Sequence, residues 1–249
     1  MEKTAVFTHS LDLALRLVDT TSGADVSGRH INVYLDGRQI RGPEKGGVLI
    51  FQNLPARQFL LELRSLYYEP VTRRVDLDSL PRGLPMLELP LIPAAGHPGG
   101  IDFLTLEGTL PGISALSAVR AGENACMIRE FEPRKRLMKL FNPHHLSLDR
   151  MLYGLVDPDN ERYEPFRILK MTDDQTAKTD RVLETEFRNY FPITPMVLGS
   201  CQPDGRYCLR VRDDGTQARW LVRWEAGGEA HFQTVDFRQE PHPRLEGGG

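Results

Sequence analysis

The chain has 249 residues, an apolar fraction of 40% and a formal charge of −3, so it can bury real hydrophobic cores. A charge this close to zero excludes binding to nucleic acid or to an anionic membrane through the overall field, so any such contact would be local. The three cysteines are too few for a disulfide framework, and a reducing compartment fits them best.

The N-terminus has no pattern typical of an export signal. Met1 begins a polar segment that leads into a strand pattern, without a basic region, an apolar run and a cleavage site. No stretch reaches the roughly 18 consecutive apolar residues that a membrane-spanning helix requires. We therefore expect a protein that is cytoplasmic or assembled into an intracellularly built particle, with no membrane insertion.

Short stretches of alternating apolar and polar residues, separated by Gly, Pro, Asp and Asn, dominate the N-terminal part of the chain. Leucine occupies every second position from Leu11 to Leu17, and a period of two is typical of a strand with one buried face. Short breaks favour antiparallel pairing, so residues 8–92 are predicted to form a seven-stranded antiparallel β-sandwich. The predicted strands are 11–18, 31–36, 38–41, 48–52, 58–65, 71–77 and 86–92.

Several segments of this region also carry a family resemblance. They are the strands Leu13–Asp19 and Ile31–Gly37, the stretch Gly47–Pro55, the strand Phe59–Leu63 and the tripeptide Tyr68–Pro70. In their order and spacing they resemble the transthyretin-like or carboxypeptidase regulatory-like domain family. The resemblance covers the N-terminal third of the chain and implies a β-sandwich. Such domains are usually non-catalytic modules that pack, space or bind. They commonly follow a signal peptide, and this chain differs from the family in that no such pattern is visible.

A segment rich in Pro and Gly follows the predicted sandwich. Residues 93–104 hold too many of both for a regular element, and we place a domain linker there. A long loop inside one domain is the alternative. The linker leads to a second β-rich domain over 105–240, and residues 241–249 are predicted to form a flexible tail.

The second domain is predicted to end in a three-stranded meander. Tight turns at 214–215 and 227–228 separate three strand patterns near the C-terminus. Pairing across the first turn places Leu209 opposite Trp220, so that apolar side chains share one face. The chain as a whole is therefore predicted to be all-β.

Two further patterns precede the meander. Residues 151–156 and 166–171 flank the sequence Asp-Pro-Asp-Asn at 157–160, which predicts a hairpin with a longer loop. The polar run 172–181 is predicted to be either a mobile loop or a short helix.

The nearest candidate for a metal site is His144 and His145, with Asp149 four residues further on. A zinc site needs three or four converging donors, whereas adjacent residues of a strand point to opposite sides. We interpret this segment as a polar loop, and we expect neither a metal nor another cofactor.

The sequence contains no motif typical of catalysis. It has no Gly-x-Ser-x-Gly elbow for a serine nucleophile and no glycine-rich loop that would hold a phosphate. Cys201 and Cys208 flank a Pro-Asp-Gly turn and are interpreted as two packed thiols. We therefore predict that the protein is not an enzyme.

A local basic run interrupts the second domain. Arg129, Arg134, Lys135, Arg136 and Lys139 alternate with two phenylalanines, a pattern that a strip for phosphates with aromatic platforms would show. Acidic residues interrupt the run. Charged side chains on an exposed strand edge, which prevent it from pairing with other chains, explain the run more simply. Nucleic acid is therefore not the partner we expect.

Aromatic residues supply the candidate ligand-binding positions. Tyr67 and Tyr68 are predicted to lie in a loop beside the sandwich, and Trp224 lies on the same strand face as Trp220. Such rings stack on sugars or anchor a partner protein. Trp220 is assigned to the core, which leaves Tyr67, Tyr68 and Trp224 as the candidate ligand-binding residues, with no catalytic residue assigned.

These observations favour a non-enzymatic structural or assembly protein that presents β-sandwich surfaces to other protein subunits. Components of phage-tail-like or contractile injection particles are an analogy for such a protein. A carbohydrate- or ligand-binding module, with a glycan as partner, is the alternative. The third hypothesis is an uncharacterised enzyme.

Overall fold

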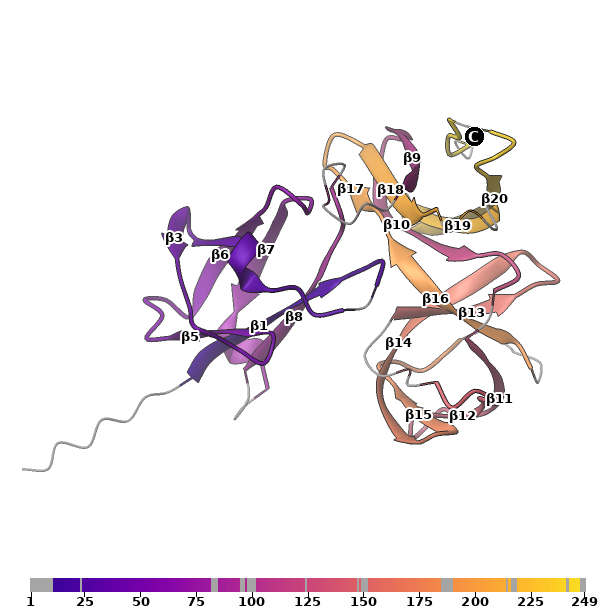
Figure 1. The fold of residues 1–249 in the computed structure, drawn as a ribbon, viewed down its shortest axis with the longest axis horizontal. Coiled ribbons are helices and arrows are strands. Elements are labelled where there is room, and N and C mark those ends of the chain that lie inside the picture. The colour runs from indigo at the N-terminus through magenta and orange to yellow at the C-terminus, as the bar shows by residue number, and fades with distance from the viewer. Residues whose placement is uncertain are drawn as a thin grey trace, which may run out of the picture. The chain divides into compact units, whose positions relative to one another are not determined.

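The computed structural model describes residues 11–22, 24–81, 85–94, 97, 102–123, 125–146, 148, 152–184, 190–213, 215, 219–240 and 242–246. Strands and turns make up most of these residues, with two short 3-10 helices at Gly28–His30 and Leu77–Ser79, which confirms the all-β class. The chain divides into two compact units, residues 1–100 and residues 101–249 (Figure 1).

The first unit consists of two four-stranded sheets. One has the order β4-β5-β1-β8 and the other the order β3-β2-β6-β7. The strands are β1 Leu11–Asp19, β2 Asn32–Leu35, β3 Arg38–Ile40, β4 Glu44–Lys45, β5 Val48–Gln52, β6 Gln58–Arg64, β7 Val71–Asp76 and β8 Met86–Leu91.

Alternate residues of these strands form one hydrophobic core. Leu13, Leu15 and Leu17 of β1 are almost completely buried, and so are Leu61 and Leu63 of β6 in the other sheet. A period of two directs every second side chain to the same side, so the two sheets bury their apolar faces against each other. All seven predicted strands are present in this sandwich.

The sandwich differs from the prediction in two respects. A two-residue strand, β4, pairs with β5 and was not predicted. The strand β8 pairs with β1 in parallel, from Ala14 opposite Met86 to Asp19 opposite Leu91. The connection between β7 and β8 passes from one sheet to the other. It places β8 beside β1, and parallel neighbours of this kind need such a crossover rather than a tight turn.

The second unit contains a closed ring of six strands. In the order β11-β12-β15-β14-β13-β16 each strand pairs with the next, and β16 pairs with β11 to complete the ring. The strands are β11 Cys126–Glu132, β12 Leu137–Phe141, β13 Leu152–Asp157, β14 Arg162–Asp173, β15 Thr176–Thr179 and β16 Pro192–Leu198. Side chains that point into the ring, including Ile128, Met138 and Phe166, form its core.

The polar run 172–181 is mostly strand rather than a mobile loop or a helix. Its residues form the end of β14, a tight turn and β15, which pairs with β12 on its other side. The hairpin predicted around 157–160 is confirmed, since Asp157 of β13 lies opposite Arg162 of β14.

The remaining strands of the second unit form two sheets around a separate core. They are β9 Phe103–Thr109, β10 Ile113–Arg120, β17 Ser200–Cys201, β18 Arg206–Arg212, β19 Arg219–Ala226 and β20 Glu229–Asp236. The order of one sheet is β17-β18-β9, while β10-β19-β20 continues from β16 of the ring. The strand β16 therefore belongs to both the ring and this second arrangement (Figure 1).

The predicted three-stranded meander is wrong in one pairing. The strands β19 and β20 form a hairpin, but β18 pairs with β9 and β17. Leu209 therefore lies opposite Leu106 rather than Trp220, although Leu209 and Trp220 share one core. Alternation does not distinguish neighbouring strands of one sheet from strands of two facing sheets, because both bury every second side chain.

Two boundaries differ from the expected linker and tail. Phe103 and Leu104 already belong to β9, so the second unit's first strand begins inside the predicted linker. In the predicted flexible tail, Leu245 is buried and its N–H donates to the Tyr207 hydroxyl at 3.0 Å. Residues 242–246 therefore pack onto the second unit. No helix among the described residues is long and apolar enough to span a membrane.

Candidate ligand-binding pocket

Tyr68, a predicted ligand-binding residue, lies inside the first unit. Its side chain is 8% exposed, its hydroxyl donates to Asp19 Oδ2 at 3.1 Å, and His97 Nε2 lies 3.1 Å from the Tyr68 hydroxyl oxygen. Burial and the neighbouring Asp19 carboxylate raise the pKa of the hydroxyl. The ring of Tyr68 is therefore part of a buried polar cluster and is not accessible for stacking.

Trp224 is also a core residue in this structure. It is 3% exposed and belongs to the same core as Trp220, with the His231 ring stacked at a centroid distance of 5.4 Å. Tyr67 is half-buried against the sandwich core and meets His30 edge to face. Of the three predicted ligand-binding aromatics, Tyr67 alone is partly exposed, and the structure does not bring the three together.

The candidate metal ligands do not converge. His145 Nδ1 lies 2.7 Å from Asp174 Oδ2 on the surface, and Asp149 lies outside the described residues. No group of three or more potential ligands that could hold a metal is found among the residues described. Cys201 and Cys208 are not joined by a disulfide, and burial raises the pKa of Cys201 to about 11.

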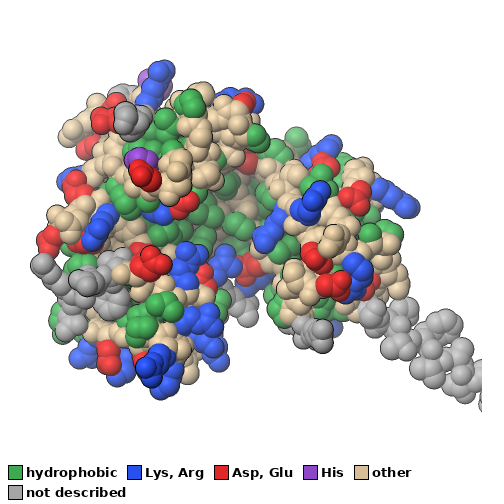
Figure 2. Space-filling view, turned by 180° about the vertical axis from the view of Figure 1, so that it is seen from behind, with side chains coloured by type: hydrophobic (Ala, Val, Ile, Leu, Met, Phe, Trp, Pro, Cys, Tyr) green, Lys and Arg blue, Asp and Glu red, His purple; other side chains and the backbone are tan. Residues whose placement is uncertain are grey.

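The basic run of the second unit forms the hairpin of β11 and β12, and two of its five cations are paired with carboxylates of the same hairpin. Lys135 lies 3.0 Å from Glu132, and Lys139 lies 2.7 Å from Glu130. The Arg136 guanidinium donates to the carbonyl oxygen of Asp180 at 2.8 Å. On the face shown in Figure 2, several Lys and Arg side chains gather on the lower part of the larger unit, with Asp and Glu side chains near them.

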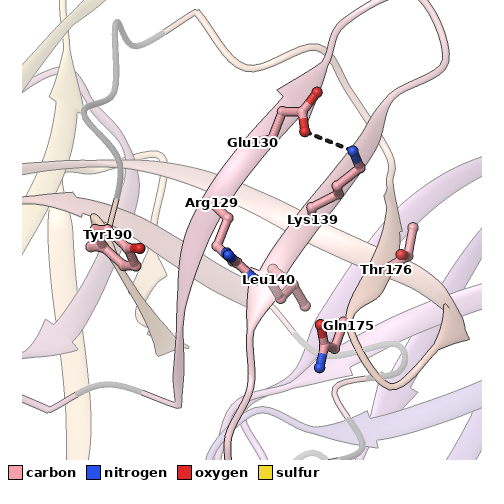
Figure 3. A pocket seen from close by; sticks show the side chains of 7 residues that line it. All are labelled: Arg129, Glu130, Lys139, Leu140, Gln175, Thr176 and Tyr190. Carbon is pink, nitrogen blue, oxygen red and sulfur yellow. Dashed lines mark hydrogen bonds and ion pairs between the residues drawn. The ribbon is translucent and has the colours of Figure 1, made fainter.

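An open pocket of about 440 Å³ lies on this hairpin, a volume within the range of small-ligand sites, about 300–1,000 Å³. We call it the hairpin pocket. The loop between β14 and β15 reaches it because the Leu140 N–H donates to the carbonyl oxygen of Gln175 at 2.8 Å. Its lining is formed by Arg129, Glu130, Lys139, Leu140, Gln175, Thr176 and Tyr190 (Figure 3).

Arg129 enters the pocket from a β-bulge. Ile128 pairs with Leu140 and Glu130 pairs with Lys139, so Arg129 is the extra residue between two consecutive pairs. A bulge redirects a side chain and interrupts regular pairing, and bulges are frequent next to functional sites. The Arg129 guanidinium makes no hydrogen bond or ion pair with any residue that the structure describes.

Tyr190 borders the pocket from another part of the chain. Its N–H donates to the Ile128 carbonyl oxygen at 2.7 Å, and the Ile128 N–H donates to Phe191, which fixes this segment against β11. Tyr190 has φ +74°, a conformation that is rare for a bulky residue and more frequent at functional sites. Its ring meets Phe141 edge to face at 6.4 Å, and both rings remain exposed, Tyr190 by 55% and Phe141 by 44%.

Among the described residues that line the pocket, the charged groups leave one positive charge in excess. Arg129 and Lys139 are cations and Glu130 is an anion. The hydrogen bond and the charge of Glu130 raise the pKa of Lys139. The Arg129 guanidinium, the Gln175 amide and the Thr176 and Tyr190 hydroxyls remain as donors for a ligand.

Sequence reasoning found part of this pocket. Arg129 and Lys139 belong to the basic run, whereas Gln175, Thr176 and Tyr190 were not identified. Thr176 pairs with Lys139 across 37 positions of sequence, and no local pattern reveals such a pairing. The polar composition of 172–181 was the available signal for a surface loop, but it did not indicate which strand the loop meets.

The first unit has a pocket of its own at one end of the sandwich. It has a volume of about 650 Å³ and lies between the β2–β3 turn, β5 and the segment that follows β5. Ile40, Leu54 and Phe59 contribute to its partly apolar lining. None of the three predicted aromatic residues lines it.

Comparisons with known proteins identify no family. No family model matches the chain, and no curated protein matches it. Among solved structures, a chimeric titin Z1Z2-Z1Z2 tandem functionalized with a GRGDS peptide from fibronectin shows 10% sequence identity, covering 82% of this chain and 80% of that one. Its TM-score of 0.13 is too low to support any conclusion about fold or function.

Proposed function

We propose that this chain is a non-enzymatic structural or assembly protein that docks other protein subunits, and that the hairpin pocket is a docking surface. The observation that carries the proposal is the combination of two exposed aromatic rings, Phe141 and Tyr190, with an arginine, Arg129, that has no partner among the described residues.

This combination matches the residues that dominate protein interfaces. Tyr and Arg are enriched among the side chains that contribute most of the binding energy, and exposed apolar side chains that gather at one place mark interaction sites. Leu146, in the loop that follows β12, is also 41% exposed. A soluble domain gains nothing for its own stability from leaving these side chains in water.

Further support comes from the first unit. Its sandwich resembles modules of the transthyretin-like or carboxypeptidase regulatory-like type, which usually pack, space or bind. The proposed role combines such a spacer with a binding surface on the second unit. A component of a phage-tail-like or contractile injection particle is the assembly that this role would fit, by analogy alone.

A glycan-binding module finds less support. It relied on Tyr67, Tyr68 and Trp224, and two of these rings are buried. Tyr67 alone provides a single half-exposed ring, whereas a sugar site needs a platform together with polar groups that fix orientation.

The test is the size of the native complex. The tagged chain is expressed at its natural level in the cells that produce it, and the extract is separated by size-exclusion chromatography. We expect elution far above the 28.2 kDa of the chain, and loss of this species in the double variant Phe141→Ser/Tyr190→Ser. Elution as a lone monomer would overturn the proposal.

A matched control removes exposed apolar surface elsewhere. Leu66 lies in the first unit and is 85% exposed, so Leu66→Ser is expected to leave the complex intact. Circular dichroism of the double variant checks that its strands are retained. Equal loss of the complex in both variants would contradict a specific role for the hairpin pocket.

A further inference from the structure

We infer that the hairpin pocket binds a carboxylate of an acidic segment in the partner protein, with Arg129 as the residue that recognises it. This inference rests on the proposed docking function and names the chemistry of the partner. It follows from the charge of the pocket, the geometry of Arg129 and the exposed rings beside it.

The charge of the described lining residues favours a ligand with one negative charge. These residues carry an excess of one positive charge, and the carboxylate among them, Glu130, already accepts a hydrogen bond from Lys139 at 2.7 Å. A charged acceptor stabilises a guanidinium, and charge-assisted hydrogen bonds are about twice as strong as neutral ones. A single carboxylate satisfies the Arg129 guanidinium and leaves the pocket neutral.

The geometry of the guanidinium favours a planar, forked acceptor. Arginine presents parallel N–H groups that match the two oxygens of a carboxylate, which gives direction as well as charge. Arg129 lies between β11 and β12 in Figure 3, with Gln175 and Thr176 beyond β12. The Gln175 amide and the Thr176 hydroxyl are further donors at the rim of the pocket.

The exposed rings indicate what stands next to the carboxylate. Phe141 and Tyr190 form an edge-to-face pair beside the pocket, and an apolar side chain that covers them would leave water. The partner segment is therefore expected to place an Asp or Glu two positions away from a Leu, Phe or similar residue. In an extended peptide, side chains two residues apart point to the same face.

The surroundings disfavour a nucleic acid or a dianionic phosphate. Glu130 and Glu132 lie on the same strand as Arg129, and Asp174 adjoins Gln175. A chain of phosphates that crossed this surface would meet these carboxylates, and Lys135 and Lys139 are already paired with two of them. A single carboxylate is the anion that the local charge accommodates.

The test is a titration of the full-length chain, labelled with nitrogen-15, with two short blocked peptides. One has the sequence Phe-Ala-Glu and the other Phe-Ala-Gln, both acetylated and amidated, and inorganic phosphate is titrated in parallel. We expect the glutamate peptide to shift the side-chain NεH signal of Arg129 and the amide signals of Thr176 and Tyr190. The glutamine peptide is expected to bind about tenfold more weakly because it lacks the charge-assisted pair.

Arginine variants provide the decisive comparison. Arg129→Gln is expected to weaken the glutamate peptide about tenfold, and Arg129→Lys, which keeps the charge and loses the fork, about threefold. Arg134→Gln is the matched control, because Arg134 is exposed on the same hairpin and does not line the pocket, so no change is expected. Tighter binding of phosphate than of the glutamate peptide, or equal binding by Arg129→Gln, would overturn the inference.

The native complex separates this inference from the proposed function. If Phe141→Ser/Tyr190→Ser abolishes the complex while Arg129→Gln retains it, docking stands and carboxylate recognition is wrong. If the unmodified chain elutes as a monomer, the docking function fails, whatever the peptides show. If Arg129→Gln and the aromatic variant both lose the complex while Arg134→Gln retains it, the result supports the docking function and the carboxylate recognition.

Discussion

The Lys139 ammonium lies 2.7 Å from a Glu130 carboxylate oxygen, directly across the β11–β12 ladder and one residue after the bulge at Arg129. Both side chains are more than 60% exposed, so the pair adds little to stability. Its main effect is electrostatic, because it cancels one of the two positive charges in the hairpin pocket.

Releasing Lys139 from this pair should strengthen anion binding. In Glu130→Gln the charge of the lining rises from +1 to +2, so the glutamate peptide is expected to bind roughly threefold more tightly at low salt. The gain should shrink on moving to 0.5 M salt, since exposed charges are screened. Titrations at the two salt concentrations measure it, and an unchanged affinity at low salt would argue against electrostatic recognition.

The buried Asp19 carboxylate should make the first unit sensitive to acid. Burial alone would raise its pKa, but hydrogen bonds from Thr21 and Ser22 lower the pKa below the ordinary aspartate value of 3.8. A pKa that is lower in the folded state contributes stability above the unfolded value, and this contribution is lost as pH falls through the folded value. Urea unfolding of the natural chain and of Asp19→Asn should therefore give a stability difference that narrows below pH 3.8. A difference that stays constant from pH 7 to pH 3 would contradict this account.

The ring should not tolerate a side chain at Gly154. A Cβ atom placed there would lie 2.8 Å from Tyr163 Cδ2 and 2.8 Å from Val119 Cγ1, closer than carbon atoms pack. Gly154→Ala is expected to lower the free energy of unfolding by about 1–3 kcal/mol through overpacking. Gly227→Asn is the control, because Gly227 has φ +61° with open space around its Cα and asparagine tolerates that conformation. Urea denaturation compares the two, and equal effects would rule out a steric cause.

Because the two units have separate hydrophobic cores, a cavity in the first unit should lower the stability of that unit alone. Leu61 is completely buried in the first unit, whereas both tryptophans of the chain lie in the second. Leu61→Ala is expected to destabilise the first unit by about 2–5 kcal/mol. Far-UV circular dichroism should detect this loss while the tryptophan fluorescence transition in urea stays in place. A parallel shift of both signals would mean that the two units unfold together.

The strands of the first unit could be predicted because their alternation and their breaks are local properties. The pattern from Leu11 to Leu17 determines which side chains share a face, and the structure buries Leu13, Leu15 and Leu17 accordingly. The parallel partner of β1 could not be predicted, since Met86 reaches Ala14 through a crossover between sheets. Partner choice depends on where distant segments pack, which a period of two does not specify.

The candidate site was harder to predict for the same reason. Trp224 was correctly placed on one face of a strand, but alternation does not reveal whether that face meets solvent or a second sheet. The bulge at Arg129 depends on the register of β11 against β12, and Tyr190 reaches the pocket from a segment that follows β15 by several residues. The basic run indicated the hairpin that carries the pocket. Its ion pair between Glu130 and Lys139 could not be predicted, because it depends on the register of the two strands.

The strand β16 has a practical consequence for dissecting this chain. Its first residues pair with β11 and β13 of the ring, while Met196, Val197 and Leu198 pair with β10 outside it. Because one continuous strand serves both sheets, no cut in the sequence frees the ring without also exposing a hydrogen-bonding edge. A fragment built to carry the hairpin pocket should therefore retain residues 101–249 as a whole.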